Sequence, residues 1–567
     1  MLTKSLLKPA LALLLASLLF WGCDGETDSL INNRLQDNPV PPEEAEADAG
    51  DADFSTFITI GNSLTAGFKD AALYDLGQSY SLGAQLAGQL QAAGAQESFN
   101  QPLINSANGF NASASNPEAG VILGRFKLDP NIPGPSPLVE GELPAEFSGD
   151  RSSLHNFGVP GVTAGELLTP QTAASNPFYG RFASAPGSST ILGDAIAANP
   201  SFFTLWIGNN DVLRYATGGA SDPEALTATA DFGADFETII ENLMSQTEAK
   251  GVVANIPPVL AIPFFRAVPF NAVELDEETA AQLNAGLATL NEVYDGMAET
   301  DLLSFSDFTE EDRDERAVSY QAGANPVLIN DPDLADIGYL FDLLASLNQI
   351  TDEQRAALEP YRQARPMREG ELLTFGAASV LGTLANPENP TSQIGVVIPL
   401  SNQFTLTANQ IIEVETARQT FNGIMQSVVD ATNENFPENR LAFYNTNEGN
   451  STFRDIFGLD DSGVGTEVGS VALEPDFSPG GVFSTDGIHP NARGTALVAN
   501  DFIEAIEAGF NATIPPLSDQ QILNLPSVQL CAGDCVSQQS LKTNDGLNGI
   551  TIRFNEAASY MAPPALP

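Results

Sequence analysis

Two short polar motifs each follow a run of apolar residues that predicts a buried strand. The run 54–60 ends in Gly-Asn-Ser-Leu at 61–64, and the run 201–207 ends in Gly-Asn-Asn-Asp at 208–211. A serine between a strand and a helix presents its hydroxyl beside free backbone N–H groups. Ser63 is therefore a candidate nucleophile, placed where a developing negative charge could be stabilised.

Two further motifs supply a turn and a candidate base. Residues 156–161 read Asn-Phe-Gly-Val-Pro-Gly, a tight turn with two glycines. Residues 486–490 read Asp-Gly-Ile-His-Pro and stand just ahead of the last predicted helix. Sites in open α/β sheets lie at the carboxyl ends of the strands, so the motifs that follow strands suit such a site.

These four blocks, in this order, resemble the SGNH hydrolase superfamily, also called GDSL esterases and lipases. Each block alone is common, but the full set, with aspartate and histidine three residues apart before a final helix, is specific. The resemblance covers about residues 54–508. It implies hydrolysis of carboxylic esters through an acyl-enzyme on Ser63, without a metal or another cofactor.

A serine hydroxyl is a poor nucleophile at neutral pH and needs a base within hydrogen-bond reach. The chain has two histidines, His155 and His489. His489 is the expected base, because His155 lies beside Asn156 and is expected to be a turn residue with satisfied hydrogen bonds. Asp486 is expected to orient the His489 imidazole and to stabilise its charged form.

The resemblance also assigns the donors that stabilise the oxyanion formed during ester cleavage. They are the backbone N–H of Ser63, the backbone N–H of Gly161 and the side-chain amide of Asn210. The first motif departs from the family name at Asn62, where an aspartate is implied. Asparagine keeps the hydrogen-bonding capacity and loses the charge. Since Asp486 is the expected partner of the histidine, Asn62 need not abolish catalysis.

Short apolar runs alternate with helical patterns from residue 54 onward, which predicts βαβ units. The expected fold is an α/β three-layer sandwich, with a central, mostly parallel sheet flanked by helices as in SGNH and flavodoxin-like proteins, and with large insertions. Strands are predicted at 54–60, 201–207, 251–256 and 441–444. Helices are predicted at 83–93, 235–249, 279–298, 408–435 and 491–508.

Composition shifts divide the chain into four expected segments. They are a signal at 1–22, a disordered acidic tether at 23–53, the hydrolase domain at 54–510 and a C-terminal tail at 511–567. Within the hydrolase domain, an insertion is expected at about 266–400, and residues 97–150, rich in Pro, Gly and Asn, are expected to form irregular loop.

The first residues predict a targeting signal. Lys4 and Lys8 precede an apolar run at 10–22 that is too short to span a membrane. The Gly22-Cys23 pair resembles a bacterial lipoprotein signal, which implies a lipid anchor on Cys23 and a place in the cell envelope, at the outer membrane or on the periplasmic or cell-surface side. The alternative is a plain secretion signal with an incidental cysteine.

Asp and Glu number 73 against 23 Lys and Arg, which gives a formal net charge of −50. So acidic a surface repels phosphate backbones and argues against nucleic-acid binding. It suits a saline habitat, because salt screens the repulsion between carboxylates; ordinary solubility is the alternative. No HExxH motif or Cys/His cluster is present, so no zinc site is expected. Cys531 and Cys535 could pair locally if the protein is exported.

Other functions fit parts of the pattern. The order Ser, Asp, His also fits α/β-hydrolases, but Thr65 stands where those enzymes have the second glycine of Gly-x-Ser-x-Gly. The resembling superfamily includes carbohydrate O-deacetylases, so an acetylated polysaccharide is an alternative substrate. The alternative of another class is a non-catalytic surface-binding lipoprotein on a hydrolase scaffold. The apolar stretch 262–265, with Pro269 and Phe270, either lines an acyl pocket or packs in the core.

Overall fold

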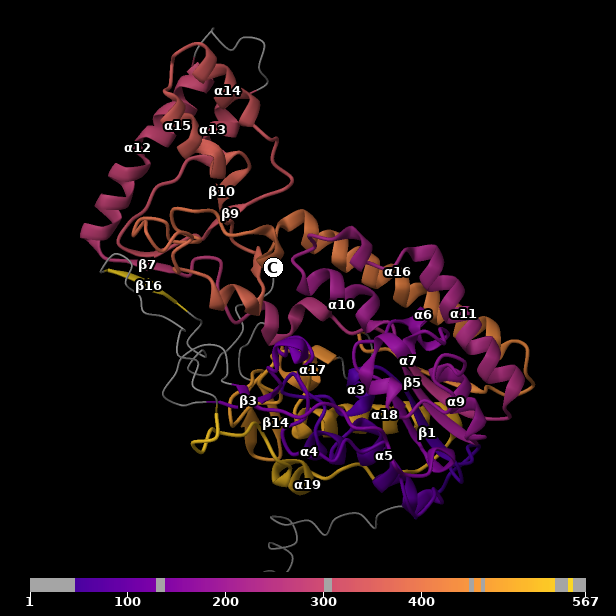
Figure 1. The fold of residues 1–567 in the computed structure, drawn as a ribbon. Coiled ribbons are helices and arrows are strands. Elements are labelled where there is room, and N and C mark those ends of the chain that lie inside the picture. The colour runs from indigo at the N-terminus through magenta and orange to yellow at the C-terminus, as the bar shows by residue number, and fades with distance from the viewer. Residues whose placement is uncertain are drawn as a thin grey trace, which may run out of the picture. The chain divides into compact units, whose positions relative to one another are not determined.

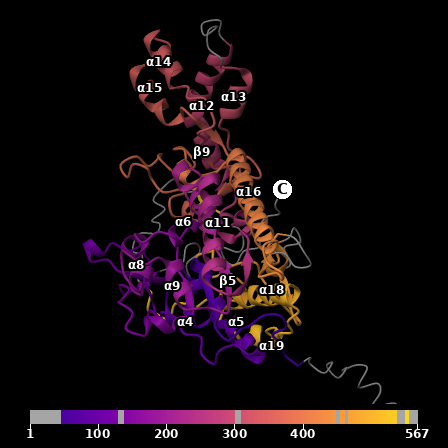
Figure 2. The ribbon, with the colours of Figure 1, turned by 90° about the vertical axis from the view of Figure 1, so that its right-hand side faces the viewer.

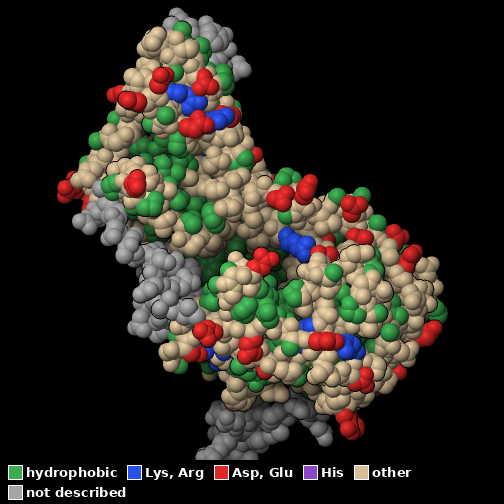
Figure 3. Space-filling view, in the orientation of Figure 1, with side chains coloured by type: hydrophobic (Ala, Val, Ile, Leu, Met, Phe, Trp, Pro, Cys, Tyr) green, Lys and Arg blue, Asp and Glu red, His purple; other side chains and the backbone are tan. Residues whose placement is uncertain are grey.

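The fold is that of a computed structural model, which describes residues 46–128, 138–299, 308–447, 453–459, 465–535 and 549–553. The predicted signal, Cys23 and all but the last residues of the predicted tether lie outside this set. Contacts group Asp48–Pro567 into one unit. Within the described part of the chain, no helix combines the length and the apolarity that a membrane crossing needs. Acidic side chains are far more frequent than basic ones on the face shown in Figure 3.

The core of the fold is a sheet of five parallel strands in the order β13-β6-β5-β1-β4 (Figure 1). The strands are β1 (Phe57–Gly61), β4 (Asn156–Gly158), β5 (Phe202–Trp206), β6 (Lys250–Ala254) and β13 (Leu441–Tyr444). Every residue of β1 and β5 is buried, as their continuous apolar runs predict. The predicted α/β fold with a central parallel sheet is confirmed, and all four predicted strands belong to it.

One strand of this sheet was not predicted. Residues 156–158 fall in the segment expected to be a turn, but they pair with Thr59–Gly61 of β1 at the edge of the sheet. A strand of three residues is too short for a periodic pattern to reveal it. Its Gly158 permits a close approach, because a Cβ there would lie 2.4 Å from the backbone nitrogen of Ala66.

Helices cover both faces of the sheet, as predicted. They include α5 (Leu82–Leu90), α11 (Thr229–Gln246), α16 (Ala408–Asn433) and α18 (Ala492–Phe510). Helices α5 and α18 pack together on one face, and α11 and α16 pack together on the other (Figures 1 and 2). The ring of Phe232 in α11 stacks on Phe421 in α16, with 4.2 Å between their centroids. Aromatic stacking of this kind holds the two helices of this layer together.

The strand order creates a crevice beside β1. The chain runs from β1 to the edge strand β4 on one side and then crosses to β5 on the other side. Loops that leave two neighbouring strands in opposite directions form the usual ligand crevice of an open α/β sheet. Helices α3 (Ser63–Ala66) and α10 (Asn209–Thr217) begin at this crevice, directly after β1 and β5. The two strand-end motifs therefore meet there.

Between β6 and α16 the chain forms a further group of elements, in the region expected to be an insertion. They include β7 (Val273–Leu275), α12 (Glu277–Glu299), α13 (Glu310–Arg316), β9 (Leu328–Asn330), α14 (Gly338–Ser346), α15 (Asp352–Leu358) and β10 (Ala364–Pro366). Arg365 is buried here and forms salt bridges with Asp331 at 2.6 Å and Glu371 at 2.5 Å. Glu371 also accepts the backbone N–H of Arg368 at 2.8 Å. Because these buried charges have lost their contact with water, their attraction to one another must compensate for the lost hydration.

The C-terminal segment expected to be a tail contributes to the fold. Helix α19 (Asp519–Asn524) packs on α18, and β16 (Ile550–Ile552) pairs antiparallel with β7. Cys531 and Cys535 lie between these two elements in the sequence and form a disulfide bond with each other. The backbone of Leu128 is hydrogen-bonded to Gln529 and Cys531 on either side, at 2.9 and 2.7 Å.

Replacing Arg365 by alanine should lower the free energy of unfolding by about 3–5 kcal/mol, because it leaves the buried carboxylates of Asp331 and Glu371 without their counter-charge. The matched control is Arg368→Ala, which removes a guanidinium whose side chain is 55% exposed and which pairs with Glu315. That change should cost less than about 1 kcal/mol. Denaturant unfolding measures both free energies. Equal losses of stability in the two variants would contradict the assigned role of Arg365.

Candidate active site

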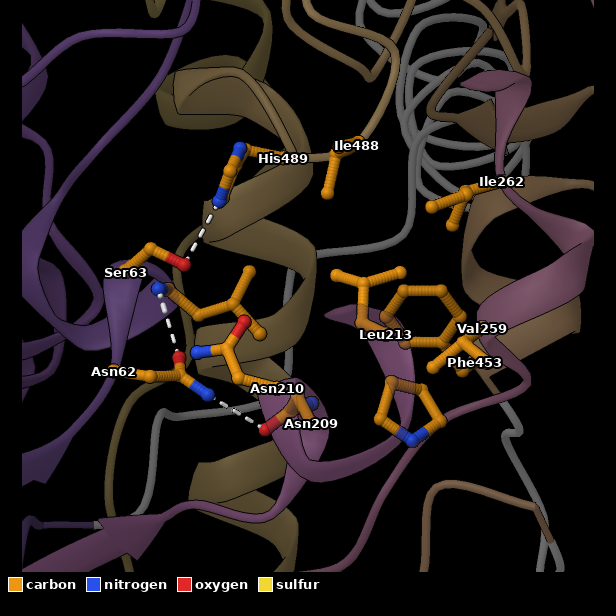
Figure 4. A pocket seen from close by; sticks show the side chains of 12 residues that line it. Asn62, Ser63, Asn209, Asn210, Leu213, Val259, Ile262, Phe453, Ile488 and His489 are labelled. Carbon is orange, nitrogen blue, oxygen red and sulfur yellow. Dashed lines mark hydrogen bonds between the residues drawn. The ribbon is translucent and has the colours of Figure 1, made fainter. Parts of the chain in front are cut away.

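The hydroxyl of Ser63 and the imidazole of His489 meet at the carboxyl end of the sheet (Figure 4). Ser63 Oγ lies 2.8 Å from His489 Nε2, and His489 Nδ1 lies 2.9 Å from Asp486 Oδ2. All three residues are buried, with 5–8% of their surface exposed. At these distances His489 can take the proton of Ser63 while Asp486 holds the other ring nitrogen.

Asn62 connects the two strand-end motifs. As the N-cap of α3, its Oδ1 accepts the backbone N–H of Leu64 at 3.1 Å. Its Nδ2 donates to Asn209 Oδ1 at 2.8 Å. A carboxylate at this position could make the second contact only if the Asn209 amide turned its nitrogen toward it. Asn62, which stands where the motif of the resembling superfamily implies an aspartate, thus positions the Ser63 turn through neutral hydrogen bonds.

Asp486 stays ionised although it is buried. Burial by itself raises the pKa of this carboxyl, but the charge and ring N–H of His489, with the backbone N–H groups of His489 and Ala71, outweigh burial and lower the pKa to about 2. Ser484 Oγ donates a further hydrogen bond at 2.9 Å. An ionised Asp486 orients the His489 ring and stabilises its charged form when a proton is taken up.

A strained turn supplies one of the donors to Asp486. Asp70 and Ala71 have φ of +53° and +60°, which costs about 1–2 kcal/mol for a residue with a side chain. The backbones of Lys69 and Ala72 exchange hydrogen bonds across the turn at 3.1 and 3.0 Å. The N–H of Ala71 then reaches Asp486 Oδ2 at 2.9 Å. Strain of this kind persists only where the surroundings hold it in place.

The Asp70 carboxyl holds this turn against the catalytic loop. It accepts the Thr485 N–H at 2.9 Å, the Thr485 hydroxyl at 2.7 Å and the Tyr74 hydroxyl at 2.6 Å. Burial raises the pKa of Asp70, and these hydrogen bonds oppose the rise. Burial likewise lowers the pKa of the neighbouring Lys69 to about 8, and its ammonium donates to Thr495 Oγ1 at 2.9 Å. Sequence analysis did not find Asp70 or Lys69, because no local motif marks a contact across 415 positions.

The three expected oxyanion donors line one cleft together with His489. Within the described part of the chain, the backbone N–H groups of Ser63 and Gly161 have no hydrogen-bond acceptor. The Asn210 amide donates one hydrogen to the carbonyl of Val162 at 2.8 Å, which leaves its second hydrogen for a ligand. The site therefore offers unused donors on the side of Ser63 where an oxyanion would form.

Helix α10 fixes the turn that carries Gly161. Asp211 Oδ2 accepts the N–H of Ala164 at 3.0 Å, and Arg214 Nη2 donates to the carbonyl of Gly161 at 2.5 Å. Arg214 also pairs with Glu166 at 2.7 Å. The φ of Gly161 is +82°, and a Cβ there would have no heavy atom within 4 Å. Conformation, rather than space, therefore requires glycine at this position.

Two hollows open beside Ser63 and His489. The first is a small pocket whose far wall is apolar. That wall contains Leu213, Pro257, Val259, Ile262, Phe453 and Ile488. Figure 4 shows Val259, Ile262 and Phe453 on the side of the pocket opposite Ser63. The second is a wider cleft of about 1020 Å³, whose lining includes Gly161, Asn176 and Arg214. The stretch 262–265 is therefore divided, because Ile262 lines the pocket while Phe265 is 1% exposed and packs edge to face with Phe264.

The remaining sequence candidates lie apart from this chemistry. His155 Nδ1 accepts the backbone N–H of Asn100 at 3.0 Å, and its ring packs against Phe99, so His155 holds the segment at 99–100 beside the start of β4. The structure joins Cys531 to Cys535 in a disulfide. Among the residues that the structure describes, no group of three or more His, Cys, Asp or Glu side chains is arranged to hold a metal ion.

Comparison with known proteins gives a distant likeness of fold. No protein-family model matches this chain, and no curated protein matches it. Among solved structures, an acetylxylan esterase from Geobacillus stearothermophilus matches with 14% identity and a TM-score of 0.19, over 37% of this chain and 62% of that one. A catalytic mutant of that esterase matches with 14% identity and a TM-score of 0.19, over 36% of this chain and 61% of that one. The likeness spans less than two thirds of the esterase, and the function must be inferred from the site itself.

Replacing Gly161 by alanine should lower both the stability of the protein and its turnover. The φ of +82° costs a residue with a Cβ about 1–2 kcal/mol, and the turn should relax so that the N–H of residue 161 moves away from the oxyanion position. Loss of such a donor typically lowers kcat about 10²–10³-fold.

Gly187→Ala is the matched control, because Gly187 has a φ of +81° and equally open surroundings on an exposed loop. Its stability loss should be similar and its kcat should match that of the wild type. Thermal unfolding and ester-hydrolysis assays on the two variants separate backbone strain from the role of the turn. Equal kcat values for both variants would contradict the assignment of Gly161.

Acid should weaken the contribution of Asp486 to stability. Its folded pKa of about 2 lies below the ordinary value of 3.8, so its ionised form stabilises the fold above about pH 4, and this stabilisation is lost as the pH falls through about 2. The difference in unfolding free energy between wild type and Asp486→Asn should therefore shrink between about pH 5 and about pH 2. Asp352→Asn, on the exposed start of α15, is the control. A difference that stays constant with pH would contradict the inferred ionisation of Asp486.

Proposed function

We propose that this protein is a serine ester hydrolase that cleaves carboxylic esters through an acyl-enzyme on Ser63. The observation that carries the proposal is the hydrogen-bonded line from Ser63 Oγ through the His489 ring to Asp486, with contacts of 2.8 and 2.9 Å. Unused N–H donors at Ser63 and Gly161 and a free amide hydrogen on Asn210 support it, because acyl transfer needs donors where the oxyanion develops.

The geometry suggests the following sequence of steps. His489 Nε2 removes the proton of Ser63 as Oγ attacks the ester carbonyl, and the ionised Asp486 stabilises the imidazolium that forms. The carbonyl oxygen, now negatively charged, receives hydrogen bonds from Ser63, Gly161 and Asn210. His489 returns its proton to the departing alcohol. Water then attacks the acyl group with His489 again as base, which releases the acid and restores the serine.

Ser63→Ala should reduce hydrolysis of a chromogenic short-chain ester by about 10⁶-fold, since the nucleophile and the base act as a unit. His489→Ala should cause a loss of the same order. His155→Ala, the matched histidine control, should leave the rate as in the wild type, because the His155 ring accepts the backbone N–H of Asn100 and lines neither hollow beside Ser63. Retained turnover in Ser63→Ala would refute the assignment of the nucleophile.

A serine-reactive fluorophosphonate probe tests the alternative of another class. A hydrolase should be labelled on Ser63, and the labelling should disappear in Ser63→Ala. A binding protein on a hydrolase scaffold should not be labelled. Absence of label on the wild-type protein, together with absence of ester turnover, would overturn the proposed function.

A further inference from the structure

The two hollows beside Ser63 differ in chemistry in a way that bears on the substrate. Each of them touches Ser63, Asn210 and His489, so each can receive one side of an ester held at the nucleophile. An ester has two sides, the acyl chain and the alcohol, which leave the carbonyl carbon in different directions. The two hollows therefore suit the two halves of one substrate.

The smaller pocket is built to exclude water from an apolar group. Its far wall joins side chains from separate parts of the chain, since Leu213 belongs to α10, Val259 and Ile262 follow β6, and Phe453 begins α17 (Phe453–Phe457). Val259, Ile262 and Phe453 are themselves 3–5% exposed. Its polar lining is confined to the end where Asn62, Ser63, Asn209, Asn210 and His489 lie. An apolar chain attached to Ser63 would fill the pocket without burying an unpaired polar group.

The wider cleft has a different character. Its lining is mixed: apolar side chains such as Phe68 and Phe178 stand beside polar ones, which include Ser113 and Thr217, and the guanidinium of Arg214. Arg214 is already paired with Glu166 and with the carbonyl of Gly161, so its charge is largely balanced. This space is much larger than the apolar pocket and is open to solvent. Its width and its polar groups suit the alcohol half of an ester, which varies in size and polarity.

We infer that the pocket lined by Leu213, Val259, Ile262 and Phe453 binds the acyl chain, and that the substrate class is esters of acyl chains longer than acetyl, with the alcohol in the wider cleft. This inference rests on the proposed function of Ser63. An acetyl group adds one methyl to the carbonyl and leaves the apolar wall bare, whereas a longer chain covers it. Each methylene buried in the pocket should raise kcat/KM about fourfold, the factor that corresponds to about 0.8 kcal/mol.

A homologous series of 4-nitrophenyl esters tests the inference on the full-length protein. With acetate, butanoate, hexanoate and octanoate, kcat/KM should rise with chain length until the pocket is full and then level off or fall. Acetylated xylan should be a poorer substrate than the best of these esters. A series in which acetate is the best ester, or faster release of acetate from xylan, would overturn the inference while leaving Ser63 as the nucleophile. No turnover of any ester and no fluorophosphonate label would instead overturn the proposed function.

Val259→Phe adds bulk to the pocket wall and should lower the ratio of hexanoate to acetate kcat/KM at least tenfold, because the longer chain is displaced and the acetyl group is not. The matched control is Val471→Phe, the same change at a residue that is 41% exposed in β15 (Val471–Leu473). It should keep the wild-type ratio. If the Val259→Phe protein is still labelled by the fluorophosphonate probe and its ratio of hexanoate to acetate kcat/KM is unchanged, the inference is overturned.

A second variant covers the case in which Val259→Phe does not fold. Phe453→Leu is a milder change that shortens one side chain of the wall, and it should move the preferred chain to a longer acyl group. The position of the maximum in the ester series is the measurement. A maximum that stays in place, in a variant that retains ester turnover and labelling, would count against this pocket as the acyl site.

Discussion

The hydrogen bond between Ser63 Oγ and His489 Nε2 is the interaction on which the rest of the site depends, and it joins positions 426 residues apart. Each partner is held by its own local structure. Ser63 is set by the end of β1 and the Asn62 cap, and His489 stands just before α18, whose first turn is capped by Asn491. Because both anchors belong to the packed sheet and helices, the chain between them can carry a long insertion at a modest entropic cost.

Asp486 and Arg365 carry buried charges that the groups around them stabilise. Asp486 receives N–H groups from Ala71 and His489, and its pKa falls to about 2 despite burial. Arg365 follows the same principle in the insertion, where it contacts Asp331 and Glu371 directly. The rest of a chain with a net charge of −50 keeps its carboxylates mostly on the surface, where water solvates them. The strained turn at Asp70 and Ala71 is part of what holds the Asp486 carboxylate ionised.

Helix α10 connects the chemistry with the shape of the site. Its first turn carries Asn210, which offers an amide hydrogen to the oxyanion position, and Arg214 holds the carbonyl of Gly161. Leu213 on the same helix lines both hollows and so forms part of the boundary between them. One helix thus places a donor, fixes the opposite turn and separates the small apolar pocket from the wider cleft. Small shifts of α10 would change all three properties together.

The sequence by itself determined the elements that have a local signature. The apolar runs before 61 and 208 marked β1 and β5, the 3.6-residue periodicity marked the long helices, and two histidines left His489 as the candidate base. Only the tertiary structure decided what depends on residues distant in sequence. It placed β4 beside β1, brought the 69–72 turn to Asp486, gave Asn62 a partner in Asn209 and divided the 262–265 stretch between pocket and core. The physical reason is that propensity and periodicity act over a few residues, whereas hydrogen bonds and packing between loops depend on positions that the folded sheet alone brings together.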